Sequence, residues 1–540
     1  EALAKWHFSF LGAEHCVARE VYDDDGNRIF SHPMWSRWAN SQFSQIREMD
    51  PVGLLLPLAL ASDKTDLSPE QSAEPLYVVS NALPLEEMRK RRHWPLAAYF
   101  SSLPPAVVAK LSNSKLLELR KELLRLGLRA IFSKYSGKTG DNPGLLGRQY
   151  RDARGILQSV HVRFQNVRLD YPVIAAWTLT LANQACFRCR RRAGEFHIVH
   201  PASSALRWVA RERAVVEEAL TKQSKKAQQD FARQYGLHPI RNDGLWDVTG
   251  LDIYQGVTIS PLHVIYHGHF PLFVELTFDS IQKQVTKAAF NALGNKIDVY
   301  ITSTVATTPF IKTSFNRGLS HYFHSALAKD GSAWQSSIKF GKITSKETMR
   351  DVMRFWRLLL IDLTPECPEL MELFTTYFDW KELVERLAHT SSSLDEAMKL
   401  YKEWAAIAVR LFGKEQFWNR IKFHIPEHLK EIVEDMMAVP YSDDAPAETA
   451  HIEGAKEPWE HTNGRNIQPT MTNYVARRDM LRLLREFAAT SSSPLPTAPL
   501  PAQPFAETAS VLSNVLMTSK TVKRISLTEV KQLNPQLEQL

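Results

Sequence analysis

The sequence predicts an α+β fold with a large, mostly helical insertion and a helical C-terminal part. Three observations lead to this prediction. An apolar run from Val52 to Ser62 ends at Asp63. Further strand-like runs and a long amphipathic helix follow it, and helical periodicity dominates from about residue 279 to residue 437. Strands and helices that are segregated along a chain in this way are typical of α+β proteins.

The composition is that of an ordinary globular protein. The chain has 540 residues, of which 44% are hydrophobic and 23% charged, and this length suits roughly two to four domains or one large enzyme. Sixty-six Lys and Arg against 59 Asp and Glu give a net charge of +7, a mild excess that permits binding to nucleic acid. Four cysteines make no disulfide framework, and no apolar run is long enough to span a membrane. Because the first residue is Glu, we expect the true start to be missing.

The first predicted core element is the strand that precedes Asp63. An apolar run of about ten residues is too short for a membrane span and fits a strand that is buried on both faces. Asp63 then stands where this strand ends. A carboxylate held on a rigid strand suits Mg2+, which prefers oxygen ligands. The alternative is that Asp63 only caps the following turn.

Further elements follow in an order that extends the sheet. Residues 74–83 and 96–100 have the apolar and aromatic content of strands. Leucines spaced through residues 104–132 predict an amphipathic helix, and residues 156–164 and 171–181 are again strand-like. Three strands, a helix and further strands are expected at the start of an RNase H-like domain, so the core is predicted to have this fold.

The helical part has its own start and stop signals. Residues 369–388 have amphipathic periodicity. Ser393 and Glu396 form a capping-box pattern for a helix that stops at Gly413. The Ser, Pro and Thr content near the C-terminus predicts a linker. The predicted organisation is an N-terminal segment (1–50), a core with a Cys/His loop (51–275), a helical insertion (276–440), a C-terminal core region (441–488), and a linker and tail (489–540).

Two basic clusters are candidates for contact with DNA. Basic residues with an adjacent aromatic residue can follow a phosphate backbone, although such runs also occur as solvated turns. The first cluster lies between the second and third strands, and the second surrounds a pair of cysteines. The members are Arg89, Lys90, Arg91, Arg92, Arg188, Arg190, Arg191 and Arg192.

A candidate zinc site consists of Cys186, Cys189, His197 and His200. Two thiolates and two imidazoles satisfy tetrahedral Zn2+, and a Cys-x-x-Cys turn is a common start of such a site. The spacing of the second half differs from that of common zinc fingers. Two free thiols and two surface histidines therefore remain as the alternative.

Several stretches resemble the Plavaka group of fungal transposases, which are relatives of the CACTA superfamily. The resemblance runs in the same order from about Tyr22 to Arg485. Residues 61–65, Ala-Ser-Asp-Lys-Thr, are similar to the family's Ser-Asp-Lys-Thr signature. Residues 77–90 resemble the strand and basic turn that follow this signature in the family.

Later landmarks of the family also have counterparts here. Cys186 and Cys189 fall where the family has its own Cys-x-x-Cys, and His263 belongs to a Leu-His pair like that of the family. The segment that contains Glu448 and His451 resembles the family's Thr-Glu-x-x-His segment near the end of the core.

The resemblance implies an RNase H-like enzyme of the DDE type, in which acidic residues hold two Mg2+ or Mn2+ ions for DNA strand cleavage and transfer. Asp63 is then the first catalytic carboxylate and Glu448 the last. Thr180 stands where the family has its middle Asp, and Thr cannot supply an anionic ligand. Asp170 and Asp252 are the candidate substitutes. Both lie on the wrong side of their motif, so the expectation is that the middle carboxylate is lost.

The sequence therefore leads to a transposon-derived DNA-binding protein with impaired or lost strand-transfer activity. The resemblance implies that it is nuclear. Two alternatives stay open: an active metal-dependent DNA transposase, and a helical protein-interaction module without a role on nucleic acid. The expected cofactors are Mg2+ or Mn2+ if the protein is active, and a structural Zn2+ if the Cys/His cluster binds metal. DNA is the expected partner, no membrane is expected, and homo-oligomerisation is left open.

Overall fold

The computed structural model divides the chain into two compact units, residues 1–476 and 477–540. The sheet and the candidate sites belong to the first unit. Asp63 and His200 lie outside the described residues. The described residues are 2–62, 65–68, 71–100, 108, 110–132, 147–198, 206–242, 244–284, 353, 368–417, 419–462, 470–479 and 481.

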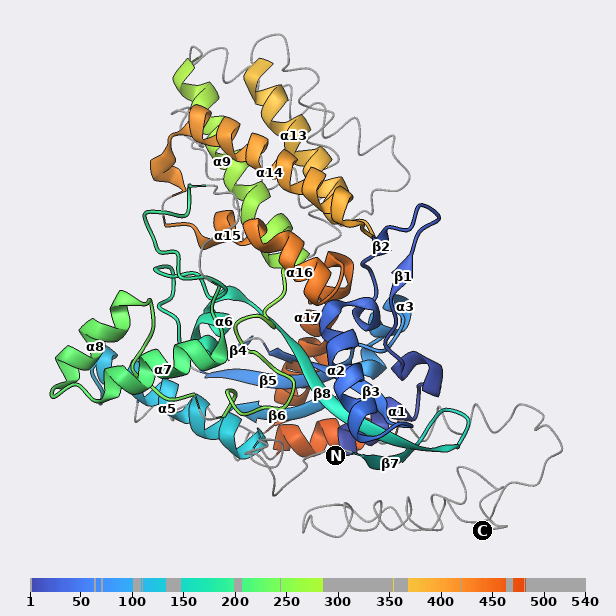
Figure 1. The fold of residues 1–540 in the computed structure, drawn as a ribbon. Helices are drawn as coiled ribbons and strands as arrows, with labels where there is room; N and C mark the ends of the chain where they lie inside the picture. Colours follow the sequence, from blue (N-terminus) through green and yellow to red (C-terminus); the bar gives the residue numbers. More distant parts are fainter. Residues whose placement is uncertain are drawn as a thin grey trace. The chain divides into compact units, whose positions relative to one another are not determined.

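The first unit contains a six-stranded sheet (Figure 1). In β3 (Leu54–Ser62) every residue is buried, as expected for an apolar strand with neighbours on both sides. β5 (Gln71–Ser80) pairs antiparallel with β3, and β8 (Leu157–Leu169) pairs parallel with it on the other side. The other strands of the sheet are β4 (Thr65–Ser68) and β6 (Leu96–Phe100), which pair with β5, and β7 (Arg148–Arg151), which pairs with β8.

This sheet confirms the strands that the sequence predicts at residues 52–62, 74–83, 96–100 and 156–164. The chain is a mixture of strands and helices, so the α+β prediction is also confirmed. Ser62 pairs with Leu169 at the ends of the two parallel strands. The chain therefore leaves β3 and β8 at the same edge of the sheet.

The predicted strand at residues 171–181 is wrong, because this segment begins with a helix, α6 (Tyr171–Thr178). Asp170 caps the helix by accepting a hydrogen bond from the N–H of Val173 at 3.0 Å, and Pro172 occupies the first turn, where proline is tolerated. Most side chains of α6 are buried. The segment therefore has no polar face that would separate a buried helix from a buried strand by periodicity.

Helices surround the sheet and form the rest of the first unit (Figure 1). The first part of the chain also contains a short hairpin of two strands, β1 (Val21–Tyr22) and β2 (Arg28–Ile29). Besides α6, its helices up to residue 234 include α1 (Ala2–Phe8), α2 (Arg37–Met49), α3 (Leu85–Met88), α5 (Asn113–Phe132), α7 (Val209–Leu220) and α8 (Lys225–Gln234). The later part contains the π-helix η4 (Leu262–His269), α9 (Phe270–Gln284), α13 (Pro368–Val384), α14 (Ser391–Phe412), α15 (Ile421–His424), the 3-10 turn η7 (Ile425–His428), α16 (Leu429–Asp435), α17 (Ala445–His451), the π-helix η9 (Ile452–Lys456) and α18 (Glu457–Glu460).

The capping box of α14 lies three residues earlier than the sequence predicts. Thr390 is the N-cap, and Ser393 serves as its partner at the third helical position. The Thr390 N–H donates to Ser393 Oγ at 3.0 Å, and the Ser393 N–H donates to Thr390 Oγ1 at 3.2 Å. The predicted stop at Gly413, which has a positive φ of 85°, is confirmed. Residues 349–352 and 354–363, which belong to the stretch of predicted helical periodicity, lie outside the described residues.

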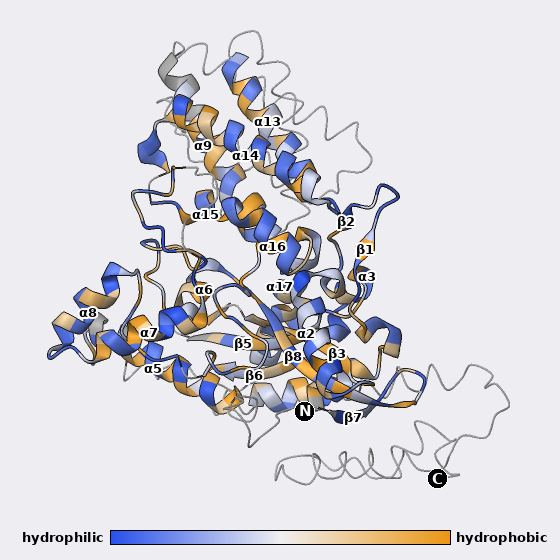
Figure 2. Cartoon of the chain, in the orientation of Figure 1, coloured by the Kyte–Doolittle hydropathy of each residue, from blue (hydrophilic) through white to orange (hydrophobic). Residues whose placement is uncertain are grey.

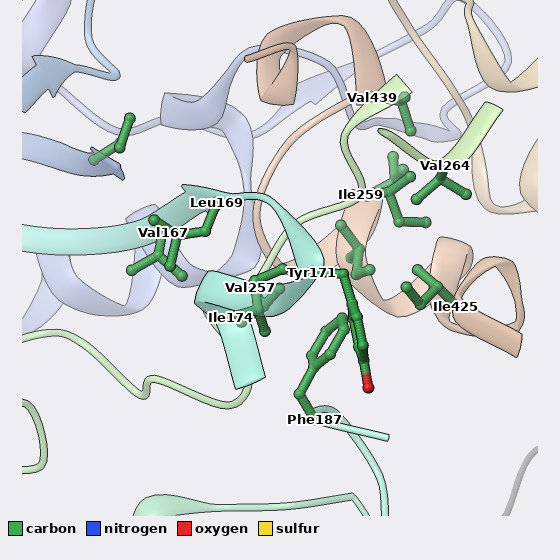
Figure 3. Close-up of a cluster of buried hydrophobic side chains, with 14 of the residues drawn as sticks. Val167, Leu169, Tyr171, Ile174, Phe187, Val257, Ile259, Val264, Ile425 and Val439 are labelled. Atoms are coloured by element: carbon green, nitrogen blue, oxygen red, sulfur yellow. The ribbon is translucent and has the colours of Figure 1, made fainter. Parts of the chain in front are cut away.

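Buried apolar side chains connect the sheet to the later helices. α13 and α14 each have apolar and polar positions along their length (Figure 2), and the apolar ones include Trp380 and Trp404, whose buried rings stack. A second group of apolar side chains joins the end of β8, α6, the cysteine turn, η4 and the segment around α15 (Figure 3). The end of β8 is thus packed directly against the elements that carry the candidate sites. No helix among the described residues is both long and apolar enough to cross a bilayer.

Candidate metal centre and carboxylate site

Cys186 and Cys189 form a buried turn after α6. Both thiols are inaccessible to solvent, and the backbone N–H groups of Arg188 and Cys189 donate to Cys186 Sγ at 3.3 and 3.4 Å. Burial and the neighbouring Cys189 raise the pKa of the Cys186 thiol, and these amide donors act in the opposite direction. The turn therefore presents two sulfur atoms side by side, as a metal-binding knuckle does.

Two histidines from a distant segment face these sulfur atoms. His424 ends α15 and His428 ends η7. Cys189 Sγ lies 3.2 Å from His424 Nε2, and Cys186 Sγ lies 3.7 Å from His428 Nε2. The two Nε2 atoms are 3.3 Å apart. All four ligand atoms lie within 4.8 Å of one another, and all four residues are buried.

These separations match those that tetrahedral coordination requires. With Zn–S bonds of about 2.3 Å and Zn–N bonds of about 2.05 Å, tetrahedral angles place two nitrogen ligands about 3.3 Å apart and a sulfur and a nitrogen about 3.6 Å apart. The observed N–N distance is 3.3 Å, and the observed S–N distances are 3.2 and 3.7 Å. This buried Cys2His2 cluster can bind a metal such as zinc. In the part of the chain that the structure describes, it is the one cluster of this kind.

Acidic side chains orient both imidazoles. His424 Nδ1 lies 3.1 Å from Glu427 Oε1, and His428 Nδ1 lies 3.4 Å from Glu431 Oε2. Arg191 Nη1 donates to both oxygens of Glu427, at 2.9 and 2.8 Å. An acceptor on Nδ1 holds the proton there and leaves Nε2 free as a ligand, which is the usual arrangement behind metal-binding histidines.

The electrostatics of the cluster favour replacement of a proton by a cation. Hydrogen bonding with Cys186 and with the imidazoles lowers the pKa of the Cys189 thiol despite burial. Burial lowers the pKa of His424, but Cys189 and Glu427 raise it more, with a net pKa of about 9. The cluster without metal therefore combines a thiolate with an imidazolium. A metal ion can take the place of that proton.

The cysteines of the predicted zinc site lie in this cluster, but the histidines are different ones. His197 is half-buried and is not part of the group, and His200 lies outside the described residues. His424 and His428 are the histidines that face the sulfur atoms. They are missed by local spacing because Cys189 and His424 are 235 residues apart in the sequence.

Asp170 stands at the carboxyl end of β8, at the sheet edge where β3 also ends. Burial raises the pKa of Asp170, and the charge of Asp444 adds to this effect. The N–H of Val173 and the charges of His263 and Lys422 act in the opposite direction. Asp170 is therefore a largely buried acid in electrostatic contact with a second carboxylate and with two basic groups.

His263, on η4, links two further carboxylates. Its Nε2 lies 3.1 Å from Asp444 Oδ2 and 3.5 Å from Glu448 Oε1, and Ser260 Oγ donates to the other oxygen of Asp444. Burial lowers the pKa of His263, but Asp444 and Glu448 raise it more, to about 9, so the imidazole is protonated at neutral pH. Since His263 also interacts with Asp170, the three acids share one neighbourhood. Asp444 is a member that sequence reasoning missed.

Glu448 reaches this neighbourhood because α17 packs against β5. Tyr77 of β5 donates from its hydroxyl to the carbonyl of Ala450 at 3.1 Å. The ring of His451 lies 5.3 Å from the Tyr77 ring. Burial lowers the pKa of His451 to about 4, so this histidine is a neutral packing residue of the helix that carries Glu448.

The other acids that the sequence suggested have different positions. Asp252 accepts hydrogen bonds from three backbone N–H groups, at 3.0, 3.0 and 3.1 Å, and thereby fixes a loop and the start of α7. Thr180 is buried just after α6 and forms a 2.9 Å hydrogen bond with Thr178. Asp63 lies outside the described residues, so its predicted role stays a prediction.

The first basic cluster lies partly at the surface. Arg89 and Lys90 are exposed, and Arg91 and Arg92 are half-buried. Glu87 forms ion pairs with Lys90 and with Arg92, the latter at 2.6 Å. Arg91 Nε lies 3.5 Å from Glu453 Oε2. Three of the four charges are therefore partly neutralised by nearby acids.

The second basic cluster is mainly structural. Arg188 is fully buried, and its guanidinium donates to two backbone carbonyls just before η4. Arg191 is also buried, and it forms an ion pair with Glu427 at 2.8 Å. Neither side chain is presented to a DNA backbone, in contrast to the expectation from the sequence. Arg190 and Arg192 lie nearer the surface.

A family model described as Plavaka transposase matches residues 7–275, about half of the chain. The match includes the whole sheet, the cysteine turn and His263, and it stops before the two histidines of the metal centre. No curated protein matches the chain. The chain belongs to the Plavaka transposase family.

Proposed function

We propose that the chain is an active DNA transposase whose RNase H-like core holds Mg2+ or Mn2+ at the sheet edge where β3 and β8 end. The observation that carries this proposal is the parallel pairing of these strands, because it brings the positions after both strands to one edge. Asp170 follows β8 at that edge, and Asp63 follows β3 in the sequence. Glu448 comes to the same neighbourhood through its contact with His263.

The strand order supports an RNase H-like core. Three antiparallel strands, β3, β5 and β6, are followed in the chain by α5 and then by β8, which pairs parallel with the first of them. This is the order from which the sequence predicts such a core.

The fold supports Asp170, one of the two candidate substitutes, as the middle carboxylate in place of Thr180. The resemblance places Thr180 at the position of the family's middle Asp, after a predicted strand at residues 171–181. Since this segment begins with helix α6, the strand beside β3 is β8, and its end is Asp170. The acid is thus on the correct side of its strand, which favours the active alternative.

The donor set fits a hard divalent cation. Asp170, Asp444 and Glu448 offer carboxylate oxygens, which Mg2+ and Mn2+ prefer. Burial and Asp444 both raise the pKa of Asp170, and a cation beside these acids favours their ionised forms. When bound, such ions activate a water or a DNA 3′-hydroxyl and stabilise the leaving oxygen. The protein holds the carboxylates on rigid elements, the end of β8 and α17.

We infer that the Cys2His2 cluster holds a structural Zn2+. Four protein ligands fill a tetrahedral coordination sphere, and the cluster is buried. Catalytic zinc sites keep a position open for water or substrate, whereas structural sites are closed. The cluster therefore fits a structural ion that joins the cysteine turn to the segment around α15.

Nicking of a supercoiled plasmid by the full chain tests the carboxylate site. We expect Mn2+-dependent nicking by the wild type and a loss of at least about 100-fold in Asp170→Asn and in Glu448→Gln, because each removes an anionic ligand. Mn2+ binding, followed by electron paramagnetic resonance, is expected to weaken in the same two variants. Asp252→Asn is the buried control: it should lower thermal stability but not the nicking rate of the folded protein.

Each outcome discriminates between the alternatives. Undiminished nicking in both carboxylate variants contradicts the proposed site. A wild type that binds duplex DNA in a salt-sensitive way but does not nick it supports a transposon-derived DNA-binding protein that has lost strand transfer. A wild type with no salt-sensitive DNA binding supports the protein-interaction module.

A further inference from the structure

We propose that the hairpin of α7 and α8, residues 206–242, is a surface that binds the phosphate backbone of duplex DNA. We call it the basic hairpin. The choice of DNA as the partner rests on the proposed function. The hairpin carries exposed cations, and its two helices are anchored to the rest of the fold.

The net positive charge of the chain is concentrated in one stretch. Residues 186–242 contain twelve Lys and Arg against five Asp and Glu, while the rest of the chain contains 54 of each. Outside this stretch the chain is therefore electrically balanced. A concentrated positive surface on a balanced protein is the electrostatic feature that attracts a polyanion.

Some of these basic residues are buried inside the fold, and others are exposed to solvent. Arg188, Arg191 and Arg207 are buried, so they cannot contact a partner. Other basic residues of the hairpin are exposed. Arg233 lies 3.9 Å from Asp230 of the same helix, in an exposed ion pair that solvent screens. The exposed basic residues of the hairpin are Arg211 on α7, Lys225, Lys226 and Arg233 on α8, and Arg241 after it.

Arg207 anchors the hairpin to the cysteine turn. Its Nε donates to the carbonyls of Cys186 and Cys189, both at 2.9 Å. Its Nη1 donates to Glu212 of α7 at 2.9 Å, and its Nη2 donates to the carbonyl of Tyr235, after α8, at 2.7 Å. One fully buried guanidinium thus holds both helices of the hairpin and the metal-binding turn in a single arrangement.

The hairpin is also attached to α6, which begins beside Asp170. The N–H of His238 donates to the carbonyl of Leu179 at 2.9 Å, and Asn242 Nδ2 donates to the carbonyl of Trp177 at 2.6 Å. Figure 1 shows α7 and α8 beyond α6, on the side of the sheet where β8 ends. DNA bound along the hairpin is therefore held next to the edge that carries the proposed carboxylate site.

The exposed cations of α8 have a spacing that suits a duplex. Lys225 and Arg233 are eight residues apart, which is about 12 Å along a helix. The major groove of B-DNA is about 12 Å wide, so the two side chains can contact phosphates on its two sides. The other exposed positions of α8 are Ala227, Gln229, Asp230 and Gln234, none of which is large and apolar. Such a face lacks the large apolar residues with which an amphipathic helix enters a membrane.

Fluorescence anisotropy of a labelled 30-base-pair duplex tests the hairpin in the full chain. Measurements in EDTA at 50 to 200 mM KCl report binding without cleavage. We expect the variant Arg211→Gln/Lys225→Gln/Lys226→Gln/Arg233→Gln to lose at least about tenfold in affinity at 150 mM KCl. The slope of log affinity against log salt concentration should fall in magnitude by the equivalent of up to about four phosphate contacts. The matched control neutralises four exposed cations on and after α14: Lys399→Gln/Lys402→Gln/Arg410→Gln/Lys414→Gln. We expect it to bind like the wild type.

A second measurement needs no variant. Acetylation of the wild-type chain, read by mass spectrometry, should be suppressed by the duplex at Lys225 and Lys226 and not at Lys399 and Lys402. Equal protection of both pairs, or an unchanged affinity and salt dependence in the hairpin variant, overturns the inference. So does a hairpin variant that loses binding to phosphatidylserine vesicles but not to the duplex.

The two proposals can fail separately. If the hairpin variant loses DNA binding and the wild type does not nick DNA, the proposed carboxylate site fails and the hairpin stands. If the wild type nicks DNA and the hairpin variant binds it normally, the hairpin fails and the carboxylate site stands.

Discussion

Replacing Glu427 by Gln is expected to weaken metal binding about 10–100-fold, which corresponds to about 1.4–2.7 kcal/mol. Glu427 lies 3.1 Å from the Nδ1 atom of His424 and has an exposed fraction of only 8%. Gln keeps the shape of the side chain but removes the charge that raises the basicity of the imidazole. The loss is largest where solvent does not screen the interaction.

Glu431 provides a matched control in the same cluster. It lies 3.4 Å from the Nδ1 atom of His428, but its side chain is 39% exposed. Solvent therefore screens its charge more than that of Glu427, and Glu431→Gln should weaken metal binding less. Both variants also remove one carboxylate, so net charge cannot account for a difference between them.

Competition with a chromophoric chelator measures the Zn2+ affinity of each variant, and circular dichroism checks that each is folded. The reasoning is refuted if Glu427→Gln binds Zn2+ as tightly as the wild type. It is equally refuted if Glu431→Gln has the larger effect, because burial would then not control the contribution of these carboxylates.

Three further predictions concern stability. Burial lowers the pKa of His269 to about 4, below its unfolded value of 6.5. The contribution of the neutral imidazole to folding stability is therefore complete above pH 6.5 and is lost as the pH falls towards 4. His269→Phe should make the fall in melting temperature over this range less steep. Arg207→Met should cost about 3–5 kcal/mol in urea denaturation because it leaves Glu212 buried without this partner, and Arg207→Met/Glu212→Leu should recover part of the loss. Gly454→Ala should cost about 1–3 kcal/mol, since a Cβ at this position overlaps the Tyr77 hydroxyl; an unchanged melting temperature would contradict this packing.

Local patterns predict the sheet and half of the metal centre. The run that forms β3 is apolar at nearly every position, and a central strand with neighbours on both sides requires this pattern. Cys186 and Cys189 are recognisable because both sulfur ligands come from one turn of the chain. In each case the physical cause acts within a few residues, so the pattern is visible without the fold.

The other half of the metal centre depends on tertiary structure. His424 and His428 approach the cysteines only after the intervening helices pack, and the sequence between the pairs contains no sign of this approach. A local signal does exist, because each histidine is followed three residues later by a glutamate, Glu427 or Glu431. On helical turns this spacing places an acid beside each imidazole. This spacing of a histidine and a glutamate, which occurs twice, indicates that both histidines are oriented metal ligands.

The exchange of a strand for helix α6 has a larger consequence for function. A buried apolar segment can be a strand or a helix by composition alone, and the choice decides which acid ends the strand beside β3. The resemblance places Thr180 at the position of the middle carboxylate, whereas helix α6 makes Asp170 the acid that follows the strand beside β3. The loss of catalysis stays a prediction, and the position of Asp170 is the reason that we propose the active alternative.

The metal centre and the carboxylate site are connected through the chain. Asp170 precedes Cys186 by 16 residues, and Glu448 follows His428 by 20, whereas 235 residues separate the two halves of the cluster. Closing a loop of this length costs about 5 kcal/mol of conformational entropy in a chain-entropy model, and a metal ion that joins its ends offsets this cost. A Zn2+ bound at the cluster would hold the segments that carry Asp170 and Glu448 in a fixed relation. Chelation of Zn2+ should therefore abolish nicking even when Mn2+ is resupplied in excess, although none of the carboxylates has been changed.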